Sequence, residues 1–232
     1  MDKEYYKNQI GRFVAVYKLK LNTVFDNMDI EANEHGNSFF NQVLQHSHPD
    51  YQIDPSDIAD EAMNRSIDHW DLLNHGRYVL LASWHVALYE AFEQQVRLFL
   101  IKEISHDYRF MNGIFVSRLK DFKTIFVLYG VNLNSVKGLK QIDHLRLLCN
   151  VVKHGEGYSA DELRKKRPDL IKTMEETELL DLYGSSLLDE SLAISVETLM
   201  GFGNAIEAFW DSFPERSFCT NTANLLRFLN KK

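Results

Sequence analysis

The chain has 232 residues, of which 45% are hydrophobic and 12% aromatic, a composition that argues against an intrinsically disordered protein. The formal net charge of −7 argues against a protein that coats nucleic acid, although it leaves room for a local basic site. Cys149 and Cys219 lie far apart and form no CxxC pair, which argues against a disulfide scaffold or a zinc ribbon. No apolar run approaches the roughly 20 residues that span a bilayer, and we expect a cytoplasmic protein without a membrane segment.

Four prolines and 11 glycines are few for this length, which favours long helices. We predict one all-α domain over 1–232, with a helix and loop extension over 1–55, a helical bundle over 56–232 and a small hairpin near 179–194. Apolar residues at steps of three and four predict the individual helices. The predicted helices cover residues 2–28, 56–75, 77–103, 113–129, 134–155, 195–213 and 217–230, with a short one beginning at a Ser159 and Glu162 capping box.

The segment between the first two predicted helices is expected to be a loop with one short helix near its middle. Its helix breakers are Asn33, Gly36, Asn37, Pro49 and Pro55. Its potential metal ligands are His35, His46, His48 and Asp50. A His-x-His pair with a carboxylate can bind a metal, but the spacing matches no structural metal motif. We therefore expect a polar surface loop, and the prediction includes neither a metal nor another cofactor.

The polar chemistry of the chain concentrates in the predicted helix that precedes Gly155. At 100° per residue, Arg146, Asn150 and His154 form a polar stripe along one side of this helix. Lys153 lies beside the stripe in the last turn, where a cation interacts favourably with the helix dipole. Each residue also has an ordinary structural explanation, such as a helix-ending cation or an amide that satisfies a neighbouring backbone group.

A basic cluster follows this helix directly and comprises Arg164, Lys165, Lys166 and Arg167. Four basic residues on a short helix are usually a solvated face. Because the cluster follows closely on His154, contact with a phosphate or with RNA is the alternative interpretation.

The segment CNVVKHGEG, residues 149–157, resembles the signature of the HEPN superfamily, the higher eukaryote and prokaryote nucleotide-binding proteins. Members are helical bundles, and many are metal-independent ribonucleases. Their motif is an arginine, commonly followed by a polar residue, and then a histidine a few positions on. Asn150 matches the polar position and His154 matches the histidine, while the helix pattern extends the similarity over residues 77–212. The resemblance implies a divergent bacterial member of this superfamily.

The chain departs from the family at one position, because Cys149 stands where the motif has arginine. The implied catalytic pair is His154, which would move the proton of the 2′-hydroxyl or of the leaving group, and Asn150. The arginine would hold the scissile phosphate, which a cysteine does poorly. Arg146 and Lys153 can substitute for it as phosphate-binding residues, although lysine lacks the bidentate fork.

Three functions remain open. The first is a HEPN-like module that binds RNA, a nucleotide or a cognate partner protein without catalysis, and we favour it because of Cys149. The second is a metal-independent endoribonuclease of a bacterial defence or toxin–antitoxin system that uses His154. The third is an unrelated helical protein-interaction domain. The resemblance also implies a homodimer, because active sites in this superfamily commonly form where two copies meet.

Overall fold

The computed structural model describes residues 3–46, 54–107, 119–214 and 218–230, and it confirms the all-α class. The α-helices and strands are α1 (Lys3–Val16), α2 (Met28–His46), α3 (Pro55–Asp107), α4 (Leu119–Leu128), α5 (Leu139–His154), α6 (Tyr158–Lys166), β1 (Thr173–Met174), β2 (Thr177–Glu178), α7 (Leu179–Tyr183), α8 (Val196–Ser212) and α9 (Thr222–Asn230). Short π and 3-10 turns follow α1 directly, over Tyr17–Leu21 and Asn22–Phe25, and further 3-10 turns lie at Leu133–Ser135 and Pro168–Leu170.

The chain divides into two compact units. The bundle unit comprises Met1–Ala15 and Ala82–Lys232, and the hairpin unit comprises Val16–Leu81. The long helix α3 contributes its first half to the hairpin unit and its second half to the bundle unit.

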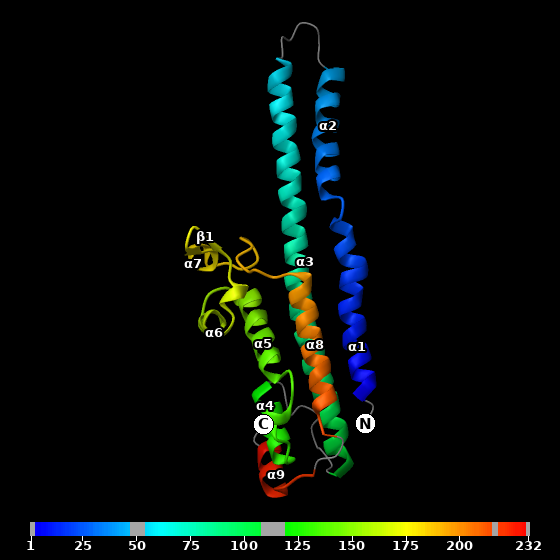
Figure 1. The fold of residues 1–232 in the computed structure, drawn as a ribbon, viewed down its shortest axis with the longest axis vertical. Helices are drawn as coiled ribbons and strands as arrows, with labels where there is room; N and C mark the ends of the chain where they lie inside the picture. Colours follow the sequence, from blue (N-terminus) through cyan, green and yellow to red (C-terminus); the bar gives the residue numbers. More distant parts are fainter. Residues whose placement is uncertain (1–2, 47–53, 108–118, 215–217, 231–232) are drawn as a thin grey trace. The chain divides into compact units, whose positions relative to one another are not determined.

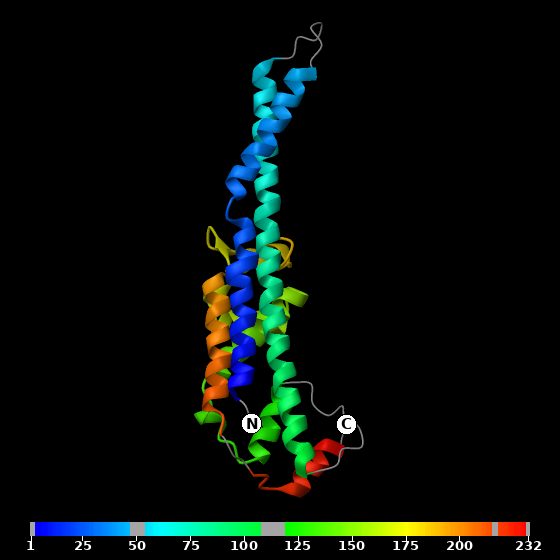
Figure 2. The same ribbon diagram turned by 90° about the vertical axis from the view of Figure 1, so that its right-hand side faces the viewer.

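In the bundle unit, α1, the second half of α3, α5 and α8 run side by side, with α1 and α5 antiparallel to α3 and α8 (Figures 1 and 2). Aromatic rings fill the space between α3 and α8. Phe92 meets Phe209 edge to face at 5.2 Å between centroids, and Phe99 meets Trp210 in the same way at 5.7 Å. The Trp210 indole nitrogen donates to Gln95 Oε1 at 3.0 Å, so the polar end of this buried ring is satisfied.

Helix α5 packs against α6 and α8 and is fixed by close backbone contacts at both ends. Gly138 precedes it with φ +75°, and a Cβ there would lie only 2.0 Å from the carbonyl oxygen of Ala205 in α8. Gly155 ends it with φ +69°, and a Cβ there would lie 2.5 Å from the carbonyl oxygen of Gly184. Only glycine combines a left-handed φ with such close approach, so these two residues set where the side chains of α5 lie.

The segment between α6 and α8 is folded by short local pairings. Strands β1 and β2 pair antiparallel, with Thr173 opposite Glu178, and form the small hairpin expected in this part of the chain. It lies over residues 173–178, whereas residues 179–183 form α7. A single bridge joins Ile171 to Leu192 before the chain enters α8.

In the hairpin unit, α2 runs antiparallel beside the first half of α3 (Figures 1 and 2). The expected loop over residues 29–46 is wrong, because this segment forms the continuous helix α2. Gly36 is not a breaker here: a Cβ at this position would lie 2.4 Å from the carbonyl oxygen of Ala62. The glycine therefore allows two helices to approach closely, which is a tertiary requirement that looks like a helix break in the sequence.

Two other predicted boundaries are also wrong. The helix stop at Gly76 does not occur, and α3 continues to Asp107. A glycine inside a helix costs about 1 kcal/mol relative to alanine, but it keeps its N–H donor, so packing on both sides can carry the helix through it. The central helix begins at Leu139 rather than near Asn134, which lies in a separate 3-10 turn.

Among the described residues, no helix combines the length and the apolar composition that a membrane crossing requires.

Candidate functional site

A groove of about 550 Å³ opens on the bundle unit between the second half of α3, α4 and α5. We call it the α5 groove. The residues that line it are Tyr89, Glu93, Leu119, Lys120, Lys123, Asp143, Arg146, Cys149, Asn150 and Lys153. Half of them lie on α5, at steps of three and four, so the groove follows one face of that helix.

The lining of the α5 groove carries more positive than negative charge, with four cations against two carboxylates. Arg146 Nε donates to Asp143 Oδ1 at 3.0 Å, and Lys153 Nζ donates to Glu90 Oε1 at 2.6 Å. Lys120 and Lys123 of α4 form no ion pair within the part of the chain that the structure describes. No carboxylate among the described residues therefore holds either ammonium group at ion-pair distance, although the charge of Lys123 helps to lower the pKa of Asp143.

The two carboxylates of the groove are shifted in opposite directions. Burial raises the pKa of Glu93, and neither the hydrogen bond from the Tyr89 hydroxyl at 2.7 Å nor the nearby cations cancel this effect. Burial also tends to raise the pKa of Asp143, but the hydrogen bond and charge of Arg146, together with the charges of Lys123 and Lys166, outweigh it and leave the pKa below its usual value. Arg146 is therefore held by an ionised partner, whereas the charge of Glu93 is disfavoured.

Cys149 lies at the floor of the α5 groove and is only 1% exposed. Its thiol donates to the carbonyl oxygen of His85 at 3.4 Å, and burial raises the pKa of the thiol well above its usual value. A neutral, buried thiol neither attacks a phosphate nor holds one. Cys149 is therefore a small packing residue in this fold.

The two residues predicted to act together in catalysis lie differently. Asn150 lines the groove, and its amide nitrogen donates to the Ser159 hydroxyl at 3.2 Å. The expected capping box at Ser159 and Glu162 is wrong, because Ser159 lies inside α6 and its hydroxyl accepts from Asn150 instead. His154 is exposed at the end of α5, does not line the groove, and has no hydrogen-bond partner among the described residues.

The predicted polar stripe is thus only partly gathered into one place. Arg146, Asn150 and Lys153 share the α5 groove, whereas His154 remains outside it. Lys120 and Lys123 were missed by reasoning from the sequence. They occur three residues apart on a predicted helix, which indicates a shared face, but nothing local to that helix indicates that the face meets α5.

The basic cluster after α5 is engaged with carboxylates of the same chain. The Arg164 guanidinium contacts Glu156, Asp161, Glu178 and Asp181. Hydrogen bonds from Arg164 to Glu156, and secondarily to Glu178, raise the pKa of the guanidinium, so its charge is permanent.

The other three cations of this cluster are paired as well. Lys165 and Lys166 both contact Glu162, and Lys166 also reaches Asp143 at 3.4 Å. Arg167 forms a fork with Asp169, its Nε and Nη2 donating at 2.8 Å and 2.6 Å. These pairings reduce the field that the cluster presents to a phosphate.

The expected polar loop with its histidines is described only in part. His48 and Asp50 lie outside the described residues. His35 stacks on His69 in the hairpin unit at 4.5 Å between ring centroids, and His69 contacts Glu31 at 3.3 Å. Within the described ranges, no group of three or more His, Cys, Asp or Glu side chains is arranged to hold a metal ion.

Comparison of the chain with protein-family models, with curated proteins and with solved structures found no match.

Proposed function

We propose that the chain is a HEPN-like helical module that binds RNA or a nucleotide through phosphate contacts in the α5 groove without cleaving it. The observation that carries the proposal is the convergence of Lys120 and Lys123 from α4 with Arg146 and Lys153 from α5 on one groove. A phosphate gains most from cations that are not already ion-paired, and the two α4 lysines form no ion pair among the described residues.

The absence of catalysis in this proposal follows from two further features of the groove. Cys149 supplies no charge to a developing phosphorane, because its thiol is buried and neutral. His154, the residue that would transfer a proton, does not line the groove. A general acid or base must reach the reacting oxygen directly or through one water molecule, so the motif histidine would not take that role for a phosphate held inside the groove.

The binding proposal is tested by fluorescence anisotropy with a labelled single-stranded RNA and with a labelled ATP, each in EDTA over a series of salt concentrations. Replacement of Lys120 and Lys123 by alanine should weaken binding and reduce the slope of log K against log salt by about 0.7 for each phosphate that the variant no longer neutralises. Lys137→Ala is the matched control, because Lys137 is exposed but does not line the groove. Equal binding by the double variant and the control would refute the groove as the binding site.

The same samples test the ribonuclease alternative. If the unaltered protein cleaves the RNA in EDTA and the His154→Ala variant does not, the protein is a metal-independent ribonuclease and the proposal of binding without cleavage is wrong. Intact RNA after prolonged incubation is the expected result.

A homodimer and a cytoplasmic location also belong to this proposal through the HEPN resemblance and the cysteine content. Both cysteines are free, as a reducing compartment requires. In that family two copies meet near the motif histidine, and His154 is exposed at the end of α5. Light scattering after size exclusion should give twice the mass of one chain, and His154→Glu should lower it. A monomeric mass for the unaltered protein would remove the dimer from the proposal.

A further inference from the structure

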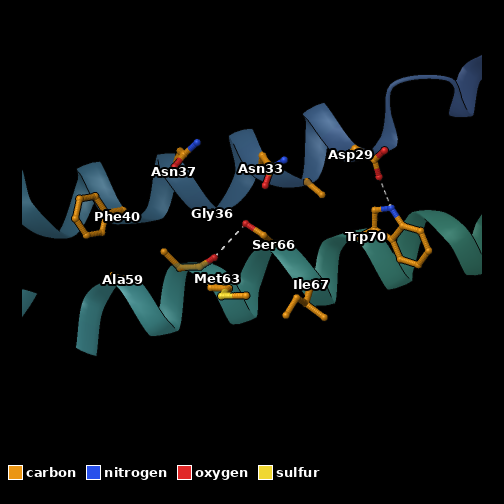
Figure 3. A pocket seen from close by; sticks show the side chains of 12 residues that line it. Asp29, Asn33, Gly36, Asn37, Phe40, Ala59, Met63, Ser66, Ile67 and Trp70 are labelled. Carbon is orange, nitrogen blue, oxygen red and sulfur yellow. Dashed lines mark hydrogen bonds between the residues drawn. The ribbon is translucent and has the colours of Figure 1, made fainter. Parts of the chain in front are cut away.

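A second groove, of about 720 Å³, runs along the hairpin unit between α2 and the first half of α3 (Figure 3). We call it the hairpin groove. Its lining residues are Asp29, Ala32, Asn33, Gly36, Asn37 and Phe40 on α2, and Ala59, Ala62, Met63, Ser66, Ile67 and Trp70 on α3. Both sets recur at steps of three and four, so one continuous face of each helix borders the groove.

The two helices approach closely at the bottom of the hairpin groove because the side chains at its centre are small. A Cβ on Gly36 would lie 2.1 Å from Ser66 Oγ and 2.4 Å from the carbonyl oxygen of Ala62, so the two helices approach almost backbone to backbone. Ser66 Oγ donates to Ala62 O at 3.2 Å, which satisfies the hydroxyl within its own helix (Figure 3). Larger side chains, among them Phe40, Met63 and Trp70, also line the groove, so it is a trough between two helices in which a third helix can pack.

The apolar side chains along the groove are not covered by the two helices that carry them. Met63 is 65% exposed and Ile67 is 48% exposed, and both line the groove. Two packed helices bury the faces that they turn toward each other, but the groove between them stays open to solvent. A third helix packed into that groove would complete a coiled-coil-like bundle. An exposed apolar strip of this kind marks a surface for association.

The charge of the hairpin unit indicates which charge a helix bound in the groove should have. Residues 16–81 contain four basic residues (Lys and Arg) and 11 acidic residues (Asp and Glu), which gives this unit a net charge of −7. The rest of the chain contains 22 basic and 22 acidic residues, so the hairpin unit carries the entire net charge of the chain. Helix α2 contains Asp29, Glu31 and Glu34 and no Lys or Arg. Arg65 on α3 is already engaged by Glu61 at 2.9 Å and by the ring of Phe39. A second copy of this unit would bring seven more negative charges to the same bundle, whereas a basic helix would neutralise them.

We infer that the hairpin groove binds a basic amphipathic helix of another protein, with its apolar face on Met63 and Ile67 and its Lys and Arg side chains toward the acidic flanks of α2 and α3. This interaction surface shares no residue with the α5 groove, so the inference does not depend on phosphate binding in that groove. Helix-in-groove recognition of this type is driven by a few apolar anchors, and charge complementarity sets the choice of partner.

The test uses the full chain and three fluorescent 21-residue model peptides. The first is a helix with leucines along one face and lysines elsewhere. The second has the same composition in an order that scatters the leucines around the helix. The third replaces every lysine by glutamate. We expect the first peptide to bind at least about ten-fold more tightly than either of the others, because only it combines an apolar face with positive charge.

Matched variants locate the binding surface. Met63→Lys and Ile67→Lys should each weaken binding of the first peptide about ten-fold. Leu72→Lys is the control, because Leu72 is also 65% exposed on α3 but does not line the groove. All three variants add the same charge at an exposed position, so the native fold should persist, and circular dichroism verifies it.

Three results would overturn the inference. One is equal binding of the ordered and the scattered peptide, which would mean charge attraction alone. Another is equal weakening by Leu72→Lys and Met63→Lys, which would place the peptide elsewhere. The last is self-association of the unaltered chain that Met63→Lys abolishes and Leu72→Lys does not, which would make a second copy the occupant.

Discussion

Replacement of Gly36 by alanine should destabilise the hairpin unit, although the same change stabilises most helix interiors. At an unobstructed position, Gly→Ala favours the helix by about 0.5–1 kcal/mol. In α2, however, the new Cβ would lie 2.1 Å from Ser66 Oγ and 2.4 Å from the carbonyl oxygen of Ala62. The serine hydroxyl can rotate away, whereas the carbonyl belongs to the helix backbone and moves only with α3.

The cost follows from that backbone contact. Cβ atoms essentially never lie within 3.0 Å of a neighbour, so α2 and the backbone of α3 must separate locally. Overpacking of this kind typically costs about 1–3 kcal/mol. After subtraction of the helix propensity gain, the free energy of unfolding of the hairpin unit should fall by about 1 kcal/mol, within a range of about 0–2.5 kcal/mol.

Denaturant titration by circular dichroism, together with amide hydrogen exchange resolved to α2, measures this change. Gly76→Ala is the matched control in the same unit, because its Cβ would meet only Phe25 Cε1 at 4.0 Å. It should stabilise by about 0.5–1 kcal/mol. Adding Ser66→Ala to Gly36→Ala should recover only part of the stability, since the Ala62 carbonyl remains. Stabilisation by Gly36→Ala equal to that by Gly76→Ala would refute the close approach of the two helices.

Three further predictions concern the bundle unit. Burial, reinforced by the charge of Arg167, lowers the pKa of His144 below 6.5, so the unfolded chain binds the proton more readily than the folded chain. The stability of the fold should therefore decrease as the pH drops below 6.5, and His144→Leu should reduce the change in melting temperature between about pH 7 and about pH 5. Arg164→Ala should lower the unfolding free energy by about 1–3 kcal/mol with Arg164→Lys intermediate, and an unchanged denaturation midpoint would contradict a stabilising network. A thiol reagent should modify Cys219 promptly and Cys149 only on unfolding, whereas two prompt thiols in the folded chain would disprove the burial.

The helical class and the strongest helices were predictable because apolar periodicity is a local property of the sequence. The end of α5 at Gly155 and a helix over about 195–213 were both expected, and both are confirmed; the structure adds that Ser195 caps α8. Two of the failures, at Gly36 and Gly76, occurred because one residue type serves opposite purposes. Gly155 ends a helix, whereas Gly36 permits contact between two helices, and the local sequence does not distinguish these cases.

The candidate site was predictable along α5 and not across to α4. Helical spacing alone places Arg146, Asn150 and Lys153 near one another, and the structure brings all three to the α5 groove. The contribution of Lys123 depends on how α4 packs against α5, which no spacing rule within one helix supplies. His154 continues the same stripe, but the groove ends before the helix does.

The binding roles of Arg164 to Arg167 stay a prediction, although a run of four cations in sequence becomes a set of intramolecular ion pairs in the fold. The reason is that the carboxylate partners come from other parts of the sequence. Glu156, Glu178 and Asp181 lie on three segments that the fold brings next to Arg164. The linear sequence shows the cations together and the carboxylates apart.

That arrangement around Arg164 has a consequence for how the sequence can drift. Loss of one carboxylate, for example Asp161 or Asp181, leaves the guanidinium with other partners, so each is individually dispensable. Loss of the arginine leaves several acidic groups facing one another without a counter-charge. In a library of random variants selected for folding, we expect position 164 to remain arginine while the individual acidic positions around it vary.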